Sequence, residues 1–543
     1  MNRLVHSWML ESAEHFPAAE AIRINNNVIS YRELQQVVTL VATHIKPVII
    51  EAEQSIGLFM GKCPEAIISI YGISCAGAVY VPLDIKNPVS RIQYIIEQCK
   101  ISTLITTPEH LDQLRSIISD TAHSFNIIVL TDSDWKSPSD QFRYIPINLQ
   151  ASVAAVTEPP IPSPVFPAFQ LSTIDSSSLL TTLFTSGSTG VPKGAMISHA
   201  SVNIFINWVV AYFQLTNTDR CISHAPLHFD LSLLDIFATH AAGACVVLVP
   251  DNMTGNPKFL TQYLAIQKIT VWQSVPSVLV LLLKYGDINK NNYPALRHVL
   301  FAGERVSGSL LEKLSIHFGN AAFHNIYGAT ETNDTFAFSI AAGTSAFPDP
   351  LPIGKALPYV DFMIVDGDNN PVSDNEEGEL LVKTPTSMRG YRNSTAASFV
   401  NIPVRNSPDE SQQYYVTRDI VRMDIDGNLL FCGRKDDIIK TNGYRVNLLE
   451  IENLLQTHSS IADVAVIAIH DDEIGNKIVA VFTTASASKP SVIDLKVFCA
   501  ASLPKYAIPH IFEFSSTPLP KTSSGKTNKQ TLIKSRGNHV ATA

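Results

Sequence analysis

The sequence predicts an α/β protein in which a large N-terminal domain is followed by a small C-terminal α+β domain. Short β-rich runs alternate with helical periodicity over most of the first 345 residues, which indicates parallel sheets. Residues 353–391 read instead as antiparallel strands separated by turn signals. Residues 437–543 then carry a pattern of their own. A chain of 543 residues is too long for one hydrophobic core, so several domains are expected.

The first αβ block, which ends before residue 157, contains four segments that we predict to be strands. Residues 55–60, 77–83, 102–107 and 126–130 are short and largely apolar, as expected of parallel strands that are buried on both faces. Helical segments at 64–76 and 90–100 lie between them, after a periodic helix at 30–45.

The later segments set the domain boundaries. Prolines crowd residues 157–178, which we expect to be a surface excursion or a connection. A second αβ block covers 179–345, and the antiparallel strands at 353–366 and 377–391 follow it. The charged segment 433–440 joins these to the last block, so we expect an N-terminal core at 1–435 and a C-terminal domain at 436–543.

The composition excludes several classes of function. The net charge of -9 gives no electrostatic footprint for nucleic acid or an anionic membrane. No run of 18 apolar residues exists, and the N-terminus lacks the apolar core of a signal peptide. The seven cysteines form neither a CxxC pair nor a Cys/His cluster, so we expect reduced thiols in a cytoplasmic protein and no structural zinc.

A Gly-Lys-Thr triplet at 525–527 raises the question of a nucleotide-binding P-loop. That motif requires a glycine at position 520, where this chain has Pro520, and it requires a following helix with its N-terminus on the phosphate. A P-loop NTPase is therefore excluded. Taken alone, Lys526 would be a solvated lysine on a Ser/Gly-rich loop.

The segment 183–199, LFTSGSTGVPKGAMISH, is the most informative in the chain. Its glycines, hydroxyl side chains and Lys193 can form an anion nest for the β- and γ-phosphates of a nucleotide. A flexible Gly/Ser linker is the alternative. An apolar strand precedes the segment and a helical pattern follows it, which argues against a linker.

Six motifs in order resemble those of the adenylate-forming superfamily, which includes acyl-CoA synthetases, firefly-type luciferases and the adenylation domains of nonribosomal peptide synthetases. Besides TSGSTGVPKG they are CAGAVYVPLD at 75–84, NIYGATETND at 325–334, YVTRD at 415–419, GRKDDIIKTNGYRVNLLEIE at 433–452 and LPKTSSGKTNK at 519–529. The resemblance covers almost the whole chain. It implies sheet subdomains and a β-rich subdomain in the N-terminal domain, with a mobile C-terminal domain that rotates about a hinge at Asp436.

The resemblance implies that a carboxylate and MgATP react to give an acyl-AMP and pyrophosphate. Lys526 would then be the catalytic lysine that bridges the carboxylate and the α-phosphate, which screens the repulsion between two anions. Thr330 would contact the α-phosphate, and Glu331 would hold Mg²⁺, although a helix-start carboxylate is the alternative for Glu331. The remaining ATP-binding residues that the resemblance implies are Thr185, Ser186, Gly187, Ser188, Thr189, Gly190, Lys193, Gly303, Glu304, Tyr327 on adenine, Asp419 on the ribose, and Arg434. Arg418 departs from the family, which usually has glycine there.

Asp230 bears on the nature of the acid. In amino-acid-activating members an aspartate at this position pairs with the substrate α-ammonium, and a buried aspartate needs such a cation. Asp230 could also cap the helix that follows it. Aligned by motif, the other pocket residues are Leu231, Leu234, Gln273, Leu300, Ala302, Ile326, Gly328, Asp334 and Thr335. The mostly aliphatic lining resembles ligases that activate proline, so we expect L-proline, while Gln273 and Asp334 leave another small or polar amino acid open.

The partner expected from the resemblance is a separate carrier protein. We expect a stand-alone enzyme, because neither a carrier domain nor a condensation domain is recognised in the sequence. The thiol acceptor would be the phosphopantetheine of that carrier protein, acting in secondary metabolite biosynthesis. A carboxylate–CoA ligase is the first alternative, and a non-catalytic binding protein of the same fold is the second. The oligomeric state does not follow from the sequence.

Overall fold

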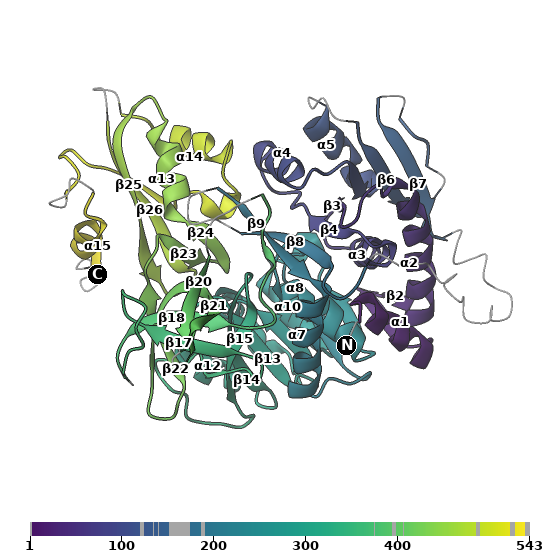
Figure 1. The fold of residues 1–543 in the computed structure, drawn as a ribbon, viewed down its shortest axis with the longest axis horizontal. Coiled ribbons are helices and arrows are strands. Elements are labelled where there is room, and N and C mark those ends of the chain that lie inside the picture. The colour runs from purple at the N-terminus through teal and green to yellow at the C-terminus, as the bar shows by residue number, and fades with distance from the viewer. Residues whose placement is uncertain are drawn as a thin grey trace.

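The computed structural model describes residues 3–119, 124–133, 135–138, 141–150, 174–185, 191–373, 375–393, 398–404, 407–484, 489–521 and 527–537. Most of the proline-rich segment 157–178 lies outside these residues. The fold is mixed α/β with a large N-terminal part and a smaller C-terminal lobe, as the sequence predicts. Figure 1 shows the lobe in yellow-green, set apart from the N-terminal helices in purple.

The first αβ block forms an eight-stranded sheet around the four predicted strands. The strands from β8 to β7 are parallel, whereas β9 and β19 add an antiparallel edge. Helix α3 begins at a proline, whose fixed φ suits the first helical turn, and ends at Gly77 with a φ of 86°. In sheet order the strands are β19 (Gly390–Tyr391), β9 (Lys193–Ser198), β8 (Leu179–Thr185), β4 (Val79–Pro82), β3 (Ser55–Phe59), β5 (Thr103–Thr106), β6 (Asn126–Thr131) and β7 (Arg143–Asn148), and the helices between them are α3 (Pro64–Ala76), α4 (Val89–Gln98) and α5 (Pro108–Ile118).

The second αβ block forms a nine-stranded sheet that also recruits the N-terminus. Strand β1 pairs with β11 in parallel across more than 200 residues of chain, so the start of the chain belongs to the second sheet. In sheet order the strands are β16 (Lys355–Ala356), β15 (Asn333–Ile340), β14 (Ala322–Ala329), β13 (His298–Ala302), β12 (Val271–Ser274), β10 (Arg220–Ser223), β11 (Cys245–Leu248), β1 (Glu20–Ile24) and β2 (Asn27–Ser30).

Helices cover these sheets. A capping box formed by Ser30 and Glu33 starts α2, in agreement with the helical signal at 30–45. The helices outside the first block are α1 (His6–His15), α2 (Tyr31–Ile45), α7 (His199–Tyr212), α8 (Leu231–Leu233), α9 (Thr239–Ala241), α10 (Pro257–Ile266), α11 (Pro276–Tyr285) and α12 (Gly308–Ser315), with a π-helical turn η2 (Leu234–Ala238) and short 3₁₀ turns η1 (Lys46–Val48), η3 (Asp251–Met253) and η4 (Ile288–Lys290). Among the described residues no helix is both long and apolar enough to cross a membrane.

An antiparallel sheet follows, where the sequence shows alternating strands and turns. It is ordered β17-β18-β21-β20, with β22 paired to β21. The strands are β17 (Asp361–Val365), β18 (Gly378–Lys383), β20 (Phe399–Val404), β21 (Ser407–Met423) and β22 (Leu429–Arg434). Strand β22 ends at Arg434, directly before the predicted hinge.

The C-terminal lobe has its own hydrophobic core between helices and a three-stranded sheet. A two-stranded hairpin, β23 (Ile438–Thr441) and β24 (Tyr444–Asn447), projects from it, and we call residues 438–447 the lobe hairpin. The other elements are α13 (Leu448–Gln456), β25 (Ile461–Asp471), β26 (Gly475–Thr484), α14 (Val492–Ala500), η5 (Lys505–Ala507), β27 (Ile511–Phe514) and α15 (Lys529–Gly537).

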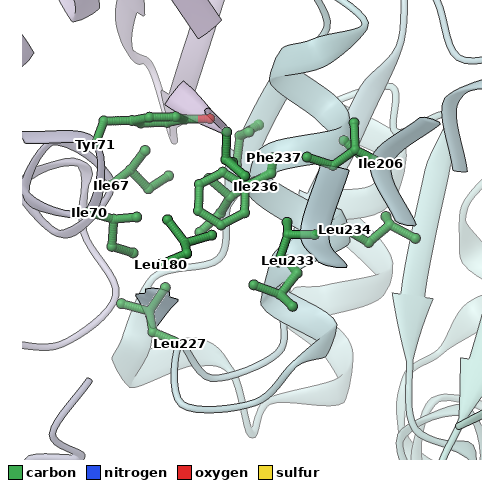
Figure 2. Packing of buried hydrophobic residues seen from close by; sticks show 14 of the residues in the cluster. Ile67, Ile70, Tyr71, Leu180, Ile206, Leu227, Leu233, Leu234, Ile236 and Phe237 are labelled. Atoms are coloured by element: carbon green, nitrogen blue, oxygen red, sulfur yellow. The ribbon is translucent and has the colours of Figure 1, made fainter. Parts of the chain in front are cut away.

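The largest core joins the two N-terminal sheets and supports the segment that follows Asp230. Figure 2 shows Tyr71 of α3 facing Phe237 of η2, and their ring centroids lie 5.5 Å apart in an edge-to-face arrangement. Leu234 packs in the same cluster and is 1% exposed. The turn that carries the predicted substrate residues is thus anchored on both subdomains.

Candidate active site

One cavity of about 1310 Å³ lies where the N-terminal sheets meet the lobe hairpin. Its walls come from strand ends and loops of the second sheet, from the end of β22, and from the hairpin itself. The predicted residues that line it are Thr185, Asp230, Leu231, Gln273, Ala302, Gly303, Glu304, Ile326, Tyr327, Gly328, Thr330, Asp334, Asp419, Arg434 and Asp436. The fold therefore brings residues from seven separated segments of the chain to one place.

The phosphate-loop segment connects two antiparallel strands beside this cavity. Thr185 ends β8 and Lys193 begins β9, and the two residues pair across the strands. Ser186, Gly187, Ser188, Thr189 and Gly190 lie outside the described residues. Burial lowers the pKa of Lys193, although the nearby Glu331 carboxylate opposes this change. The Lys193 ammonium lies 5.2 Å from the centre of the Tyr391 ring.

Glu331 lies in the tight turn between β14 and β15 and is fully buried. One guanidinium nitrogen of Arg445 donates to both of its carboxylate oxygens at 3.1 Å, and the Tyr391 hydroxyl donates at 2.6 Å. The Thr185 hydroxyl lies 3.4 Å from the same oxygen that Tyr391 contacts. Burial raises the pKa of Glu331, but the cation and the hydroxyl outweigh it, so the pKa lies below its ordinary value. Glu331 is therefore an anion here.

The donor set around Glu331 fits Mg²⁺. This ion uses oxygen ligands and commonly needs only one or two protein carboxylates when substrate phosphates supply the rest. Glu331 and the Thr185 hydroxyl are such ligands, adjacent to the phosphate-loop strands. Within the described ranges no cluster of three or more His, Cys, Asp or Glu residues could hold a metal ion, so a metal here would depend on phosphate oxygens.

Asp419, Arg434 and Tyr327 form one network in the cavity wall. The Tyr327 hydroxyl and the Arg434 guanidinium each donate to one oxygen of Asp419. Arg434 also donates to both oxygens of Asp436, at 2.8 and 3.0 Å. Burial raises the pKa of Asp419, and the Arg434 charge works against that increase. The carboxylate expected to hold a ribose is thus oriented by two donors.

Arg418, which departs from the family pattern, has a φ of 65°. That is the left-handed region, where glycine is favoured. The Arg418 side chain is about half exposed, and its guanidinium lies 3.6 Å from Glu379. The chain thus keeps the glycine-like backbone with a side chain directed at a neighbouring carboxylate.

Two carboxylates, Asp230 and Asp334, line the part of the cavity where we expect the substrate acid. Asp230 precedes α8 but makes no side-chain cap bond to it, so the capping alternative is wrong. Burial raises the pKa of Asp230, while a hydrogen bond with the Thr330 hydroxyl lowers it. Burial and the neighbouring Asp230 raise the pKa of Asp334 to about 8. The Gln273 side-chain oxygen, on a side chain 3% exposed, has no hydrogen-bond partner among the described residues.

The remaining predicted pocket residues divide into two groups. Leu231, Ala302, Ile326 and Gly328 line the cavity. Leu234, Leu300 and Thr335 are fully buried behind its wall, and the Thr335 hydroxyl donates to the Tyr327 carbonyl at 3.1 Å. These three support the wall in this structure and do not form its surface.

The glycine and glutamate at 303 and 304 contact the lobe hairpin. The Glu304 carboxylate accepts hydrogen bonds from the Gly443 amide at 2.5 Å and the Ser277 amide at 2.9 Å. A Cβ on Gly303 would lie in ordinary contact with the Lys440 ammonium, at 3.6 Å, and the φ of 96° is what favours glycine at this position.

The sequence analysis did not single out Lys440, Arg445 or Tyr391. Lys440 and Arg445 lie opposite each other on the two strands of the hairpin, and both line the cavity. Burial lowers the pKa of Lys440, and the charges of Asp419 and Asp230 oppose that effect. In the sequence, these two cations stand out because each lies among apolar residues of a short strand segment, IIKT or YRVN.

Lys526 lies outside the described residues. The residues that bracket the segment, Lys521 and Thr527, pair with each other on the lobe, and the Lys521 ammonium contacts Asp463 at 2.6 Å. Lys529 contacts Asp437 at 2.9 Å and Glu452 at 3.0 Å. Of the described residues that line the cavity, none comes from beyond Tyr506.

Comparisons with known proteins agree with these findings. A family model described as AMP-binding enzyme matches residues 9–392, and the model of an AMP-binding enzyme C-terminal domain matches residues 450–526. An L-proline ligase of an L-prolyl-carrier protein from Pseudomonas fluorescens is 30% identical over 98% of this chain and 99% of its own. A D-alanine ligase of a D-alanyl carrier protein from Lactiplantibacillus plantarum is 28% identical over 93% of each chain.

A solved structure shares the fold. The Vibrio cholerae adenylation domain AlmE, in complex with glycyl-adenosine-5′-phosphate, superposes with a TM-score of 0.81 at 21% identity, covering 99% of this chain and 98% of that one. At this identity the likeness concerns the fold alone.

Proposed function

The chain belongs to the AMP-binding enzyme family, and from this premise we propose that it is a ligase that activates an amino acid as its aminoacyl-AMP and then loads it onto a carrier protein. The observation that carries the proposal is the cavity itself. Asp230, Thr185 and Asp419 line it together, and Glu331 lies 3.4 Å from the Thr185 hydroxyl, which supports an ammonium site at Asp230 and a MgATP site around Thr185, Glu331 and Asp419.

The first step joins two anions. A carboxylate oxygen of the amino acid forms a bond to the α-phosphorus of ATP, and the bond from that phosphorus to pyrophosphate breaks, with the electron pair leaving on pyrophosphate. Asp230 holds the substrate ammonium, Thr330 donates to the reacting phosphate, and Lys193 faces the leaving pyrophosphate. Mg²⁺, held through Glu331, would neutralise phosphate charge. Lys526 bridges carboxylate and phosphate, which lowers their repulsion.

The second step needs a thiol, and we propose the phosphopantetheine thiol of a separate carrier protein. Its sulfur attacks the carbonyl carbon of the adenylate, and AMP leaves. Ligases of carrier proteins for two different amino acids match this chain over nearly its whole length, which supports this acceptor over CoA. CoA-dependent release of AMP at the same rate would favour the carboxylate–CoA ligase instead. We place this activity in the cytoplasm and in secondary metabolite biosynthesis.

L-Proline is the substrate we propose first. Leu231, Ala302 and Ile326 give the cavity an aliphatic wall, and a proline ligase is among the relatives at 30% identity. D-Alanine ligases are nearly as similar. Asp334 favours a second candidate, a polar or cationic amino acid, because a buried carboxylate beside Asp230 would gain from a second positive group.

Amino-acid-dependent ATP–pyrophosphate exchange over the common amino acids, salicylate and acetate decides the matter. We expect exchange with proline, and we expect Asp334→Val to retain or increase it, since this variant removes a buried carboxylate that proline does not pair with. If a basic amino acid is the substrate, Asp334→Val should reduce its exchange by about tenfold or more, the usual cost of removing a charge partner. No exchange with any acid would contradict the proposed function.

We also propose that the domains divide at 435/436 and that Asp436 is the hinge. Asp436→Pro should retain pyrophosphate exchange and slow aminoacyl transfer to the carrier by about tenfold or more, because proline restricts the backbone that must rotate between the steps. Asp436→Asn is the matched control. It removes the ion pair with Arg434 while leaving the backbone free, so it should transfer normally. Unimpaired transfer by Asp436→Pro would contradict the hinge assignment.

A further inference from the structure

Arg445 bridges two parts of the protein that the chain holds apart. It lies on β24 of the lobe hairpin, whereas Glu331 lies in the turn after β14 of the second sheet. One guanidinium nitrogen is 3.1 Å from each carboxylate oxygen, Glu331 is fully buried, and the Arg445 side chain is 22% exposed.

This ion pair differs from the other contacts between lobe and core. The Lys284–Glu473 pair is almost half exposed on both sides, and such pairs contribute little. Arg91 of α4 contacts Glu450 of α13 at 3.1 Å but lies far from the phosphate-loop strands along the chain. Among the ion pairs of the described residues, Arg445–Glu331 is the one in which a lobe residue contacts the carboxylate that fits Mg²⁺.

A divalent cation at Glu331 would compete with this guanidinium for the carboxylate. Arg445 already contacts both oxygens, and the Tyr391 and Thr185 hydroxyls approach the same Oε1. A metal ion bound there would face the Arg445 positive charge at ion-pair distance in a buried site, where screening by water is weak.

We propose that Mg²⁺ and Arg445 use Glu331 in turn: the metal ion during adenylation, and Arg445 when the lobe is seated as in this structure for thiol transfer. This assignment rests on the proposed function for the naming of the two steps. Arg445 is then a positioning residue for the second step. It pairs with the buried Glu331 carboxylate, which would otherwise have no counter-ion after the metal leaves with pyrophosphate.

The pairing also orders the reaction. The lobe seats fully only after the metal has left Glu331, so thiol attack follows pyrophosphate release. Gly443, two residues before Arg445, hydrogen-bonds to Glu304, and Tyr444 packs edge-to-face on Phe229 with centroids 5.0 Å apart. These contacts fix the position of the hairpin against the N-terminal domain. Arg445 makes that position depend on whether a metal ion occupies Glu331.

Binding of Mn²⁺ to the full-length protein saturated with a non-hydrolysable ATP analogue, measured by electron paramagnetic resonance, tests the proposal, because the phosphate oxygens supply ligands that Glu331 and Thr185 do not. We expect Arg445→Met to bind Mn²⁺ at least about tenfold more tightly than the wild-type protein, because the competing cation is gone. Arg445→Lys keeps a charge and should lie between them. Adding Glu331→Gln to Arg445→Met should abolish the gain. Equal Mn²⁺ affinity in wild type and Arg445→Met, or no detectable binding in either, would overturn the proposal.

Arg91→Met is the matched control, because it breaks a contact of the same interface without altering the charge at Glu331. We expect it to leave Mn²⁺ affinity unchanged. An equal gain in Arg91→Met would show that loosening of the lobe alone exposes the metal site, which would also overturn the proposal.

A second measurement follows transfer from preformed aminoacyl-AMP to the carrier thiol. We expect Arg445→Met to slow this step while pyrophosphate exchange continues, with partial rescue by Arg445→Lys. Since Mn²⁺ binding to the complex with the ATP analogue needs no amino acid and no turnover, an Arg445-dependent affinity in a protein without exchange would contradict the proposed function and leave the pairing intact.

Discussion

Replacing Lys526 with alanine is expected to lower amino-acid-dependent ATP–pyrophosphate exchange by about 100- to 1,000-fold, or roughly 3–4 kcal/mol of transition-state stabilisation. This lysine is the one cation that we assign to the contact between the substrate carboxylate and the α-phosphate. We assign Lys193 to the other end of the phosphate chain, where it would not replace Lys526.

The physical reason is the approach of two anions. Without a positioned positive charge, the carboxylate and the triphosphate repel each other, and the charge that builds on phosphorus has no partner. Since the charge is needed only for adenylation, transfer from preformed aminoacyl-AMP should continue. Lys526→Arg keeps the charge with a different geometry and should recover only part of the rate.

Lys521→Ala is the matched control for that experiment. Lys521 lies five residues before Lys526 in the sequence, but its ammonium contacts Asp463 on the surface of the lobe. We expect exchange within about threefold of wild type, since exposed pairs contribute little. Comparable losses in Lys521→Ala and Lys526→Ala would show that loop order, and not the Lys526 charge, controls the step.

Replacing Lys62 with methionine is expected to destabilise the N-terminal core by about 1–3 kcal/mol, because the Ser223 carbonyl loses a buried donor and Asp235 loses the charge that opposes the effect of its burial. Lys62 is 5% exposed, and its ammonium donates to the Ser223 carbonyl at 3.0 Å. Asp235, in η2, is 1% exposed, and neither of its carboxylate oxygens has a hydrogen-bond partner among the described residues.

Lys62 and Asp235 depend on each other across the two N-terminal subdomains. Lys62 follows β3 of the first sheet, while Asp235 and Ser223 belong to the second αβ block. Burial lowers the pKa of Lys62 and raises the pKa of Asp235, and the attraction between the two groups opposes both effects. Without the Lys62 ammonium, Asp235 loses the positive charge that opposes the effect of burial on its pKa.

Urea unfolding followed by tryptophan fluorescence measures this loss. The double variant Lys62→Met/Asp235→Leu should recover much of it, because replacing both charges by apolar groups removes the desolvation cost. If the single variant lies within about 1 kcal/mol of wild type, or if the double variant is no more stable than the single, then the two groups are not coupled.

Much of the fold follows from local sequence pattern. Strands β3, β5 and β6 match the predicted runs to within a residue or two, because strands buried on both faces are almost continuously apolar and stand out from the amphipathic helices between them. The pairing of β1 with β11 could not be predicted, since nothing in a short strand states which distant strand it joins.

Within the candidate site, the motif residues gather because each follows the end of a strand. Thr185 ends β8, Glu331 follows β14, and Arg434 ends β22, so edges of three sheets meet at the cavity. Motif spacing could not show which pocket residues line the cavity and which are buried behind its surface. Leu234 aligns as a pocket residue, yet the π-helical turn directs it into the core with Phe237 (Figure 2).

The sequence by itself determined the αβ alternation, the separate C-terminal lobe, and the residue types that we assign to phosphates, ribose and an ammonium group. These depend on periodicity and on chemistry carried within single motifs. Only the tertiary structure decided that Arg445 pairs with Glu331, that Lys440 reaches the cavity, and that Asp334 lies beside Asp230. Such contacts depend on how one rigid unit packs against another, and no local pattern encodes the distance between two residues that meet only after the domains dock.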